Sequence, residues 1–172
     1  MRRSIAFALL ATVGGAAFAG TNDYGGYDIV EHPGVTESDW GEALGWRIVQ
    51  GQIDGRTVYC AAELEFDDQL VRIGTDKLPD RDTGQWQLAI PLAADDADWQ
   101  GTLGPVGEER PASGALRNDW TIAWLRAGAA YELSRGPTAR FATGGWDFTF
   151  PTRGIRAASL AVVECAGVDH FE

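Results

Sequence analysis

Adjacent carboxylates are the residues whose type and spacing could most readily do chemistry in this chain. Asp67-Asp68 and Asp95-Asp96 are neighbouring acids, and Asp98, Glu108 and Glu109 follow the second pair. Two close carboxylates can act as acid and base in hydrolysis, or hold a cation such as calcium. Asp is also favoured in turns, where its side chain bonds to nearby backbone, so solvated turns are the plainer interpretation of both pairs.

Motifs for metals, phosphates and nucleophiles are incomplete. Asp80-Arg81-Asp82-Thr83-Gly84 resembles the start of a calcium loop, but its twelfth position is Pro91 where an EF-hand needs Glu. Zinc needs three or four close ligands, whereas the chain has two distant histidines, His32 and His170, and two cysteines. Neither a nucleophile elbow nor a phosphate-binding glycine loop is present. The sequence therefore predicts no catalytic residue, no metal ligand and no cofactor.

The N-terminus has the order of a secretory signal peptide. Arg2 and Arg3 precede a short apolar run, residues 5–13, and Ala17-Phe18-Ala19 supplies small residues for cleavage. That run is shorter than the roughly 20 residues that span a bilayer, so a membrane anchor is the weaker alternative. We expect residues 1–19 to be removed after Ala19, leaving a periplasmic or secreted domain, residues 20–172, without a transmembrane segment.

The two cysteines fit that compartment, because exported proteins form disulfides. A bond between Cys60 and Cys165 would close a loop of 165 − 60 = 105 residues. The alternative is a free catalytic thiol, which needs a base nearby. The only histidines lie near the two ends of the chain, so we predict the Cys60–Cys165 disulfide.

The charge balance limits the partners. Without Arg2 and Arg3, 12 basic residues face 25 acidic ones. Such a surface repels nucleic acid and anionic lipid and favours solubility. It could also steer a protein with a basic surface.

The first firm structural signal is a hairpin. Asp54-Gly55 separates two β-type runs, residues 45–53 and 56–61, and Asp-Gly is typical of a type I′ turn. Symmetrical pairing about that turn places Val49 opposite Cys60. Directly opposed residues share a sheet face, so Cys60 is expected on the face of Val49.

Other segments extend this sheet and end in a helix. Residues 118–127 show helical spacing, although Ile122 and Leu125 leave a strand possible. Residues 154–166 carry one apolar stripe before Gly167, which predicts a helix with a glycine C-cap. Further strands are expected at residues 63–66, 69–74, 85–92, 131–134, 139–142 and 146–150.

Two stretches are predicted to be irregular: an N-terminal arm, residues 20–41, and a long acidic loop, residues 93–114. We predict an α+β domain with a mainly antiparallel, twisted, sandwich-like sheet of about seven or eight strands. One or two helices pack on it, and the disulfide links the C-terminal helix to a strand.

Several of these features together resemble a known family. A Trp-containing strand (Gly45-Trp46-Arg47-Ile48), Tyr59-Cys60, Trp86-x-Leu88-x-Ile90, and an Ala-rich helix ending in Cys165 follow in order. Residues 148–154, before that helix, belong to the same pattern. This succession, over residues 45–166, resembles the exported alphaproteobacterial envelope proteins of the invasion-associated locus B type. The resemblance implies a non-enzymatic envelope role and transfers no catalytic residue.

Function is therefore expected in binding. The leading hypothesis is a non-enzymatic periplasmic or secreted binding protein, associated with the cell envelope. Alternatives are an acidic inhibitor or immunity-type protein that blocks a basic partner, and a hydrolase with an unrecognised carboxylate site. The candidate partner-binding residues lie in the acidic loop: Asp95, Asp96, Asp98, Trp99, Glu108 and Glu109.

Overall fold

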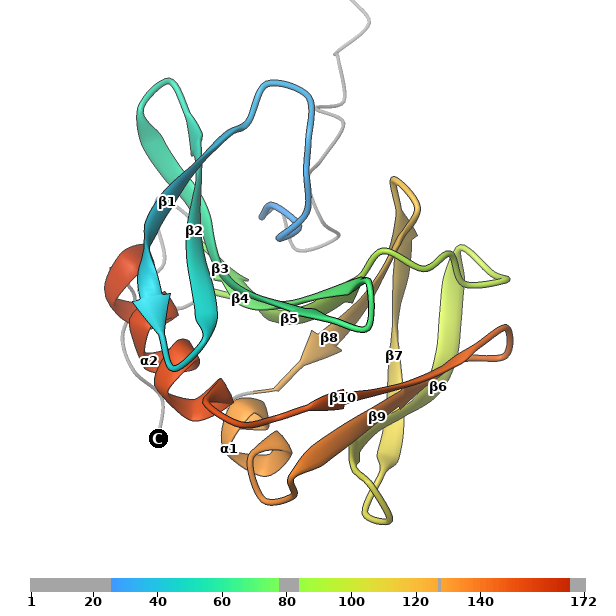
Figure 1. Ribbon diagram of the computed structural model, residues 1–172. Coiled ribbons are helices and arrows are strands. Elements are labelled where there is room, and N and C mark those ends of the chain that lie inside the picture. The colour runs from blue at the N-terminus through green and yellow to red at the C-terminus, as the bar shows by residue number, and fades with distance from the viewer. Residues whose placement is uncertain (1–25, 78–83, 127, 168–172) are drawn as a thin grey trace, which may run out of the picture.

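The chain forms one long antiparallel sheet with two helices, seen in a computed structural model that describes residues 26–77, 84–126 and 128–167 (Figure 1). The strand order is β1-β2-β3-β4-β5-β8-β7-β6-β9-β10. The elements are β1 (Thr36–Ala43), β2 (Trp46–Ile53), β3 (Arg56–Phe66), β4 (Gln69–Asp76), β5 (Trp86–Ile90), β6 (Asp98–Pro105), β7 (Arg110–Arg117), β8 (Trp120–Leu125), α1 (Ala129–Leu133), β9 (Thr138–Ala142), β10 (Asp147–Pro151) and α2 (Ile155–Ala166). The prediction of a mainly antiparallel α+β fold is confirmed, with ten strands in place of seven or eight.

The sheet curls strongly, so that β9 and β10 pass beneath β4 and β5 in Figure 1. The main core fills the space inside this curl. It joins Ile73 and Leu88 of the upper strands to Phe141 and Phe150 of β9 and β10. A second, smaller core lies on the other face of β2–β5 and β8, beneath residues 27–35. The same strands therefore bury both of their faces.

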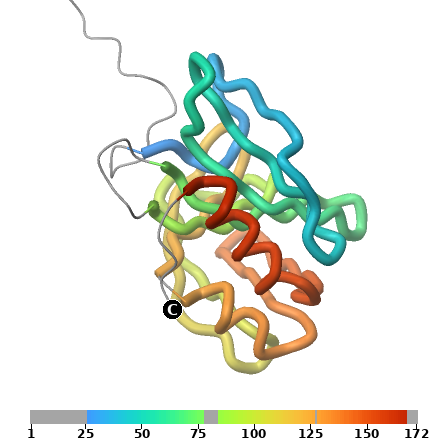
Figure 2. The backbone as a smooth tube through the Cα atoms, turned by 90° about the vertical axis from the view of Figure 1, so that its left-hand side faces the viewer, coloured from blue at the N-terminus to red at the C-terminus, as the bar shows by residue number. Residues whose placement is uncertain are grey.

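Helix α2 closes the left side of the curl, beside β1–β3 (Figure 2). Its apolar stripe is buried, and Gly167 ends it in the left-handed conformation with φ 58°, as the sequence predicts. Cys165 bonds Cys60 of β3, with the two Cα atoms 6.1 Å apart. The predicted disulfide between the helix and a strand is confirmed.

The first hairpin departs from symmetrical pairing. Asp54 and Gly55 form the expected turn, with φ of 50° and 74°. A bulge next to Gly51 then shifts the register, so Val49 pairs with Ala61 and Gln50 pairs with Cys60. Cys60 consequently points into the main core, whereas Val49 lies in the second core. The expectation that these two residues share a face is wrong by this one-residue shift.

The stretch predicted as a long acidic loop, residues 93–114, is mostly the β6–β7 hairpin. Its glycines suggested a loop, but two of them are required within strands. A Cβ on Gly101 would collide with the carbonyl of Ala142, and one on Gly114 with the carbonyl of Ile122. Close backbone approach, rather than flexibility, explains these glycines.

Two local assignments are also corrected. The helix expected over residues 118–127 is β8, and the strand expected over 131–134 belongs to α1. Asn118 and Asp119 take positive φ of 49° and 67° and form the β7–β8 turn. Both faces of β8 are buried, so its apolar pattern lacks the alternation that marks a half-exposed strand.

The described part of the N-terminal arm is firmly held. Residues 36–43 form β1, and Ile29 and Val30 are fully buried in the second core. The Ile29 amide donates to Gln87 Oε1 over 3.1 Å. Residues 26–35 are irregular in conformation, as expected, but they pack closely on the sheet instead of docking loosely. The predicted signal peptide, residues 1–19, lies outside the described residues.

Candidate functional site

The six residues predicted to bind a partner do not form one surface. Asp95, Asp96 and Asp98 lie where β6 begins, whereas Glu108 and Glu109 lie in the β6–β7 turn at its other end. A strand of 8 residues separates them, which corresponds to roughly 20 Å or more. Glu108 pairs with Arg135 at 3.1 Å, and Glu109 lies 3.8 Å from Arg140. The acids therefore occupy the two ends of a hairpin.

Trp99, the sixth of these residues, belongs to the core. It is 3% exposed, and its indole Nε1 donates to the Ile122 carbonyl over 3.1 Å. Its ring lies 5.1 Å from that of Phe141. A side chain held in this way has no surface for a partner, so Trp99 stabilises the hairpin that carries the acids.

Charged side chains do gather elsewhere, on the sheet face that the arm covers. Arg47, Glu63 and Arg72 are directly opposed on β2, β3 and β4. Glu63 Oε1 lies 2.5 Å from Arg72 Nη2, and Glu63 Oε2 pairs with Arg47. Asp39 of β1 pairs with Arg47 at 2.9 Å. We call Asp39, Arg47, Glu63, Arg72 and Glu37 the charge row.

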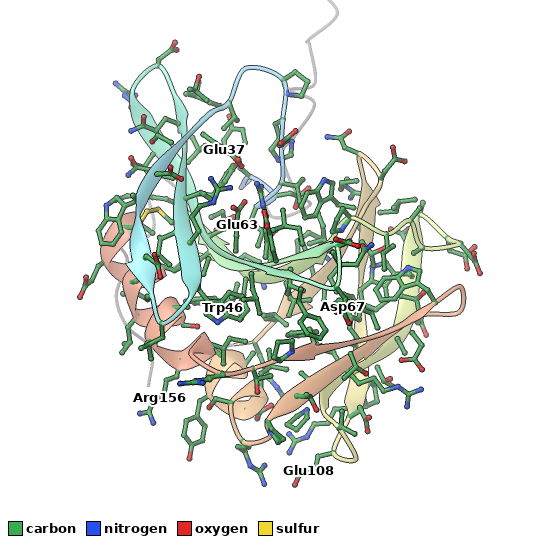
Figure 3. The ribbon with its side chains drawn as sticks, in the orientation of Figure 1. Glu37, Trp46, Glu63, Asp67, Glu108 and Arg156 are labelled. Carbon is green, nitrogen blue, oxygen red and sulfur yellow. A yellow bond between two sulfur atoms is a disulfide. The ribbon has the colours of Figure 1, made fainter. Side chains whose placement is uncertain are left out.

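Glu37 joins the charge row to the arm. Its two carboxylate oxygens accept from Arg72 Nη1 and Nη2 over 2.7 and 2.9 Å, and Tyr59 donates to it as well. Arg72 Nη1 also donates to the Ile29 carbonyl over 3.1 Å, and its guanidinium lies 5.0 Å from the Trp120 ring. Figure 3 shows Glu37 and Glu63 on the opposite side of the sheet from Trp46.

These contacts shift the ionisation of the row. Burial alone would raise the pKa of Glu37, but the hydrogen bonds and charge of Arg72 outweigh it and lower that pKa. Burial and the bond to Glu37 raise the pKa of Tyr59. Burial lowers the pKa of the nearby His32, whose Nε2 bonds the Asp28 carbonyl over 2.8 Å. Ionised Glu37 and neutral His32 are thus the forms that suit the folded arm.

The charge row is best explained as the attachment of the arm. Its acids and bases alternate along the row, so that each charge lies against an opposite one. Glu63 and Arg72 have side chains only 2% and 3% exposed, which leaves a ligand no access while the arm is in place. The stronger candidate for binding therefore lies on the open surface.

A groove opens at the opposite end of the molecule, where α2 begins. It has a volume of ≈ 660 Å³ and lies between the β1–β2 turn, the start of α2 and the segment that leads into β9. We call it the Leu44 groove, and its main lining residues are Leu44, Pro137, Arg153, Arg156, Ala157 and Leu160. Arg156 lies at this lower end in Figure 3, far from Glu37.

Leu44 is an unusual choice at its position. Six non-glycine residues of the described part of the chain have positive φ, and five of them are Asp or Asn: Asp54, Asp67, Asp68, Asn118 and Asp119. Leu44 is the sixth, at φ 49°. Short polar residues tolerate this left-handed conformation, whereas Leu does so at a cost in free energy. Leu44 is also 74% exposed, the highest value among the exposed large apolar side chains.

The turn that carries Leu44 is fixed against α2. Gly154 has φ 83°, and a Cβ there would lie 2.8 Å from the Leu44 carbonyl and 3.0 Å from Leu44 Cβ. Trp46 Nε1 donates to the Arg153 carbonyl over 2.9 Å. Glycine at 154 thus permits the close approach, and Trp46 holds the backbone that precedes the helix. Both sides of the groove are set before any ligand arrives.

The groove combines an apolar lining with positive charge. Arg153 and Arg156 form no ion pair within the described residues, whereas most other described arginines do. The Arg156 guanidinium lies 5.3 Å from the ring of Tyr131, which is 57% exposed. Leu160, on the next turn of α2, is 42% exposed. These groups suit a ligand that is both apolar and anionic.

The sequence analysis missed the Leu44 groove entirely. Its residues come from position 44 and from positions 134–160, so no local pattern unites them. One signal was available: a Leu-Gly pair, Leu44-Gly45, just before a strand-like run. Leu at a tight turn breaks the usual turn chemistry and marks a residue to explain.

Comparisons with known proteins give no information about the site, so its interpretation depends on its geometry. No family model, no curated protein and no solved structure matches the chain. The resemblance to the invasion-associated locus B type therefore stays a prediction. Across the described residues, no group of three His, Cys, Asp or Glu side chains could hold a metal ion. No helix among them is long and apolar enough to cross a membrane.

Proposed function

We propose that this protein is an extracytoplasmic binding protein whose Leu44 groove takes an extended, apolar and acidic segment of a partner protein. The observation that carries the proposal is Leu44, a large apolar residue in a left-handed turn position and 74% exposed. Its conformation and its exposure both disfavour it in an isolated molecule. A contact that buries Leu44 against a partner would explain why a leucine is found at this position. The disulfide is consistent with an extracytoplasmic location.

The chemistry of the partner follows from the groove's lining. Leu44, Pro137 and Leu160 would bury apolar side chains, and Arg153 and Arg156 would pair with carboxylates. The net charge of −11 alone favours a basic partner. We propose an acidic partner instead, because the groove itself carries the positive charges of Arg153 and Arg156. Repulsion between the partner and acids more than about 10 Å away is largely screened at ordinary salt concentrations.

A peptide segment suits the groove better than a membrane surface does. The groove is shallow and open, and it sets Leu44, Pro137 and Leu160 beside Arg153 and Arg156. An extended segment with both apolar and acidic side chains can reach both kinds of group. A bilayer is broad enough to face the acids around the groove as well, so the net charge of −11 opposes its binding, whereas a segment confined to the groove faces mainly the two arginines. The partner is therefore proposed as protein, with membrane binding as the result that would contradict it.

The test is selection of binding peptides from a random display library on the disulfide-bonded protein. The expected peptides combine apolar residues with Asp or Glu. Leu44→Asn should weaken their binding about tenfold or more, since one buried Leu contributes roughly 1.5–3 kcal/mol. Arg156→Gln should weaken them to a similar degree and flatten the dependence on salt.

Val106→Ser is the matched control. Val106 is 54% exposed in the β6–β7 turn, outside the groove, so this variant also removes an exposed apolar side chain but should leave peptide binding unchanged. Peptides without acids, or peptides that bind the Leu44→Asn variant equally well, would contradict the proposal. Leu44-dependent sedimentation with vesicles containing phosphatidylglycerol would replace the protein partner with a membrane.

A further inference from the structure

A second, smaller cavity lies on the other side of the α1–β9 segment from the Leu44 groove. It measures ≈ 90 Å³ and lies between the β6–β7 hairpin, the end of β8 and α1. Its apolar lining includes Leu103, Leu125 and Leu133. Three arginines from separate segments also line it: Arg110 at the start of β7, Arg126 after β8 and Arg135 after α1.

The carboxylates that line this cavity are open to solvent and hold the arginines loosely: Glu132 is 41% exposed, and Arg110 and Arg126 are 54% and 65% exposed. Arg110 and Arg126 share one partner, Glu132, at 3.5 and 3.6 Å. A good charge-assisted hydrogen bond between such groups measures about 2.7–2.9 Å, and the Asp39–Arg47 contact of this protein reaches 2.9 Å. Arg135 pairs with Glu108 at 3.1 Å. Glu132 therefore satisfies neither of its two guanidinium groups fully.

We propose that this cavity binds a carboxylate with a short apolar tail, and that Glu132 is the internal carboxylate it displaces. The incoming carboxylate would bond to Arg110 and Arg126, and its tail would lie on Leu103, Leu125 and Leu133. The ligand is either a free short-chain acid or an acidic side chain of a bound protein. The inference does not depend on the Leu44 groove, since the two sites have different linings.

Size and lining favour a carboxylate over phosphate or sulfate. One water occupies about 10–15 Å³ on the scale of this volume, so ≈ 90 Å³ admits a carboxylate and a few methylene groups. Two oxygens in a plane match the fork of a guanidinium. A tetrahedral dianion has no apolar part for the leucines, which line one side of this otherwise polar cavity.

Titration of the isotope-labelled protein with sodium hexanoate tests this inference, using the backbone amide resonances of Gly104, Ala129 and Leu133. We expect saturable shifts with a dissociation constant in the millimolar range. Glu132→Gln should tighten binding about fivefold or more, because the internal competitor loses its charge. Arg126→Gln and Arg110→Gln should each weaken it about tenfold.

Hexanol is the ligand-side control, which needs no variant: it shares the tail but lacks the carboxylate and should not bind. Arg156→Gln, in the Leu44 groove, should leave hexanoate binding unchanged. Equal binding of hexanol, tighter binding of inorganic phosphate, or no gain in Glu132→Gln would overturn the inference. If hexanoate displaces an acidic peptide whose binding is lost in Arg126→Gln and kept in Arg156→Gln, the natural carboxylate belongs to a partner; if selection yields no such peptide, the ligand is a free acid.

Discussion

The charge row and the Leu44 groove show opposite relations between local chemistry and exposure. In the charge row, the two central charges are buried and paired: Arg72 is nearly inaccessible and contacts Glu37, Glu63 and the Ile29 carbonyl. In the Leu44 groove, apolar side chains are exposed at positions where polar side chains would be more favourable. Leu44 is 74% exposed and has a positive φ, a conformation that among the other described non-glycine residues only Asp and Asn adopt.

This difference separates groups that stabilise the fold from groups available for binding. A buried ion row is destabilised when one member is lost, because the remaining charge is left in a poor environment. An exposed leucine in a left-handed turn contributes little to the fold, and its replacement should be harmless or better. Substitutions at the two regions should therefore change stability in opposite directions.

The largest effect is expected from Arg72→Met. Glu63 would lose its buried partner and Glu37 the two hydrogen bonds from Arg72, so the free energy of unfolding should fall by about 3–5 kcal/mol. Urea unfolding with the disulfide intact measures this change. Hydrogen exchange at the Ile29 amide, which bonds Gln87, should become faster because the arm loses its attachment to the sheet.

Arg153→Met is the matched control for Arg72→Met. It removes the same charge from an exposed position without an ion pair in the described structure, and should change stability by less than about 0.5 kcal/mol. An Arg72→Met variant as stable as this control would mean that the charge row does not hold the arm.

The elements with strong local signals were predictable from sequence, and the groove was not. Helix α2 follows from its apolar period and from Gly167, and its disulfide follows from the two cysteines of a chain that is predicted to be exported. The Asp54-Gly55 turn was also correct. The predicted sheet face of Cys60 was wrong, because a bulge next to Gly51 shifts the register. The ring of Tyr59 lies over Gly51, and a Cβ at that position would overlap the ring.

Both regions depend on long-range pairing. Arg47, Glu63 and Arg72 read as scattered surface charges until the register of β2, β3 and β4 aligns them. The Leu44 groove needs the β1–β2 turn to meet the start of α2, and that meeting depends on Gly154 and on the Trp46 bond to Arg153. The net charge alone predicts a basic partner, whereas the proposed groove favours an acidic segment, because net charge averages over surfaces of different character.

A change of pH should have an intermediate effect on the free energy of unfolding. This effect should come from the groups that hold the N-terminal arm on the sheet. Burial lowers the pKa of His32, so the unfolded chain binds the proton more readily than the folded one. The stabilising contribution is therefore complete above the unfolded pKa, about 6.5, and is lost progressively as the pH falls below it. The charges facing His32 are those of Glu37, which raises its pKa, and Arg72, which lowers it further.

Urea unfolding at a series of pH values from 7.5 to 5 measures this contribution. The wild type should lose stability as the pH falls across this range, and His32→Gln should flatten the curve there. Glu37→Gln should act lower, because the pKa of Glu37 is itself lowered and its contribution is lost only as the pH falls below about 4.5. An unchanged slope in His32→Gln would show that the arm is not the pH-sensitive element.

The smallest expected effect is the most diagnostic, because it has the opposite sign. Leu44→Asn places a residue that tolerates φ 49° in the β1–β2 turn, and should raise the free energy of unfolding by about 0.5–1 kcal/mol. The melting temperature should rise by roughly 2–4 °C, a size expected for a domain of this length. Asp54→Leu is the converse control in the β2–β3 turn and should lower stability by a similar amount. A Leu44→Asn variant that is less stable than the wild type would mean that Leu44 is retained for packing, and the contrast between the two regions would fail there.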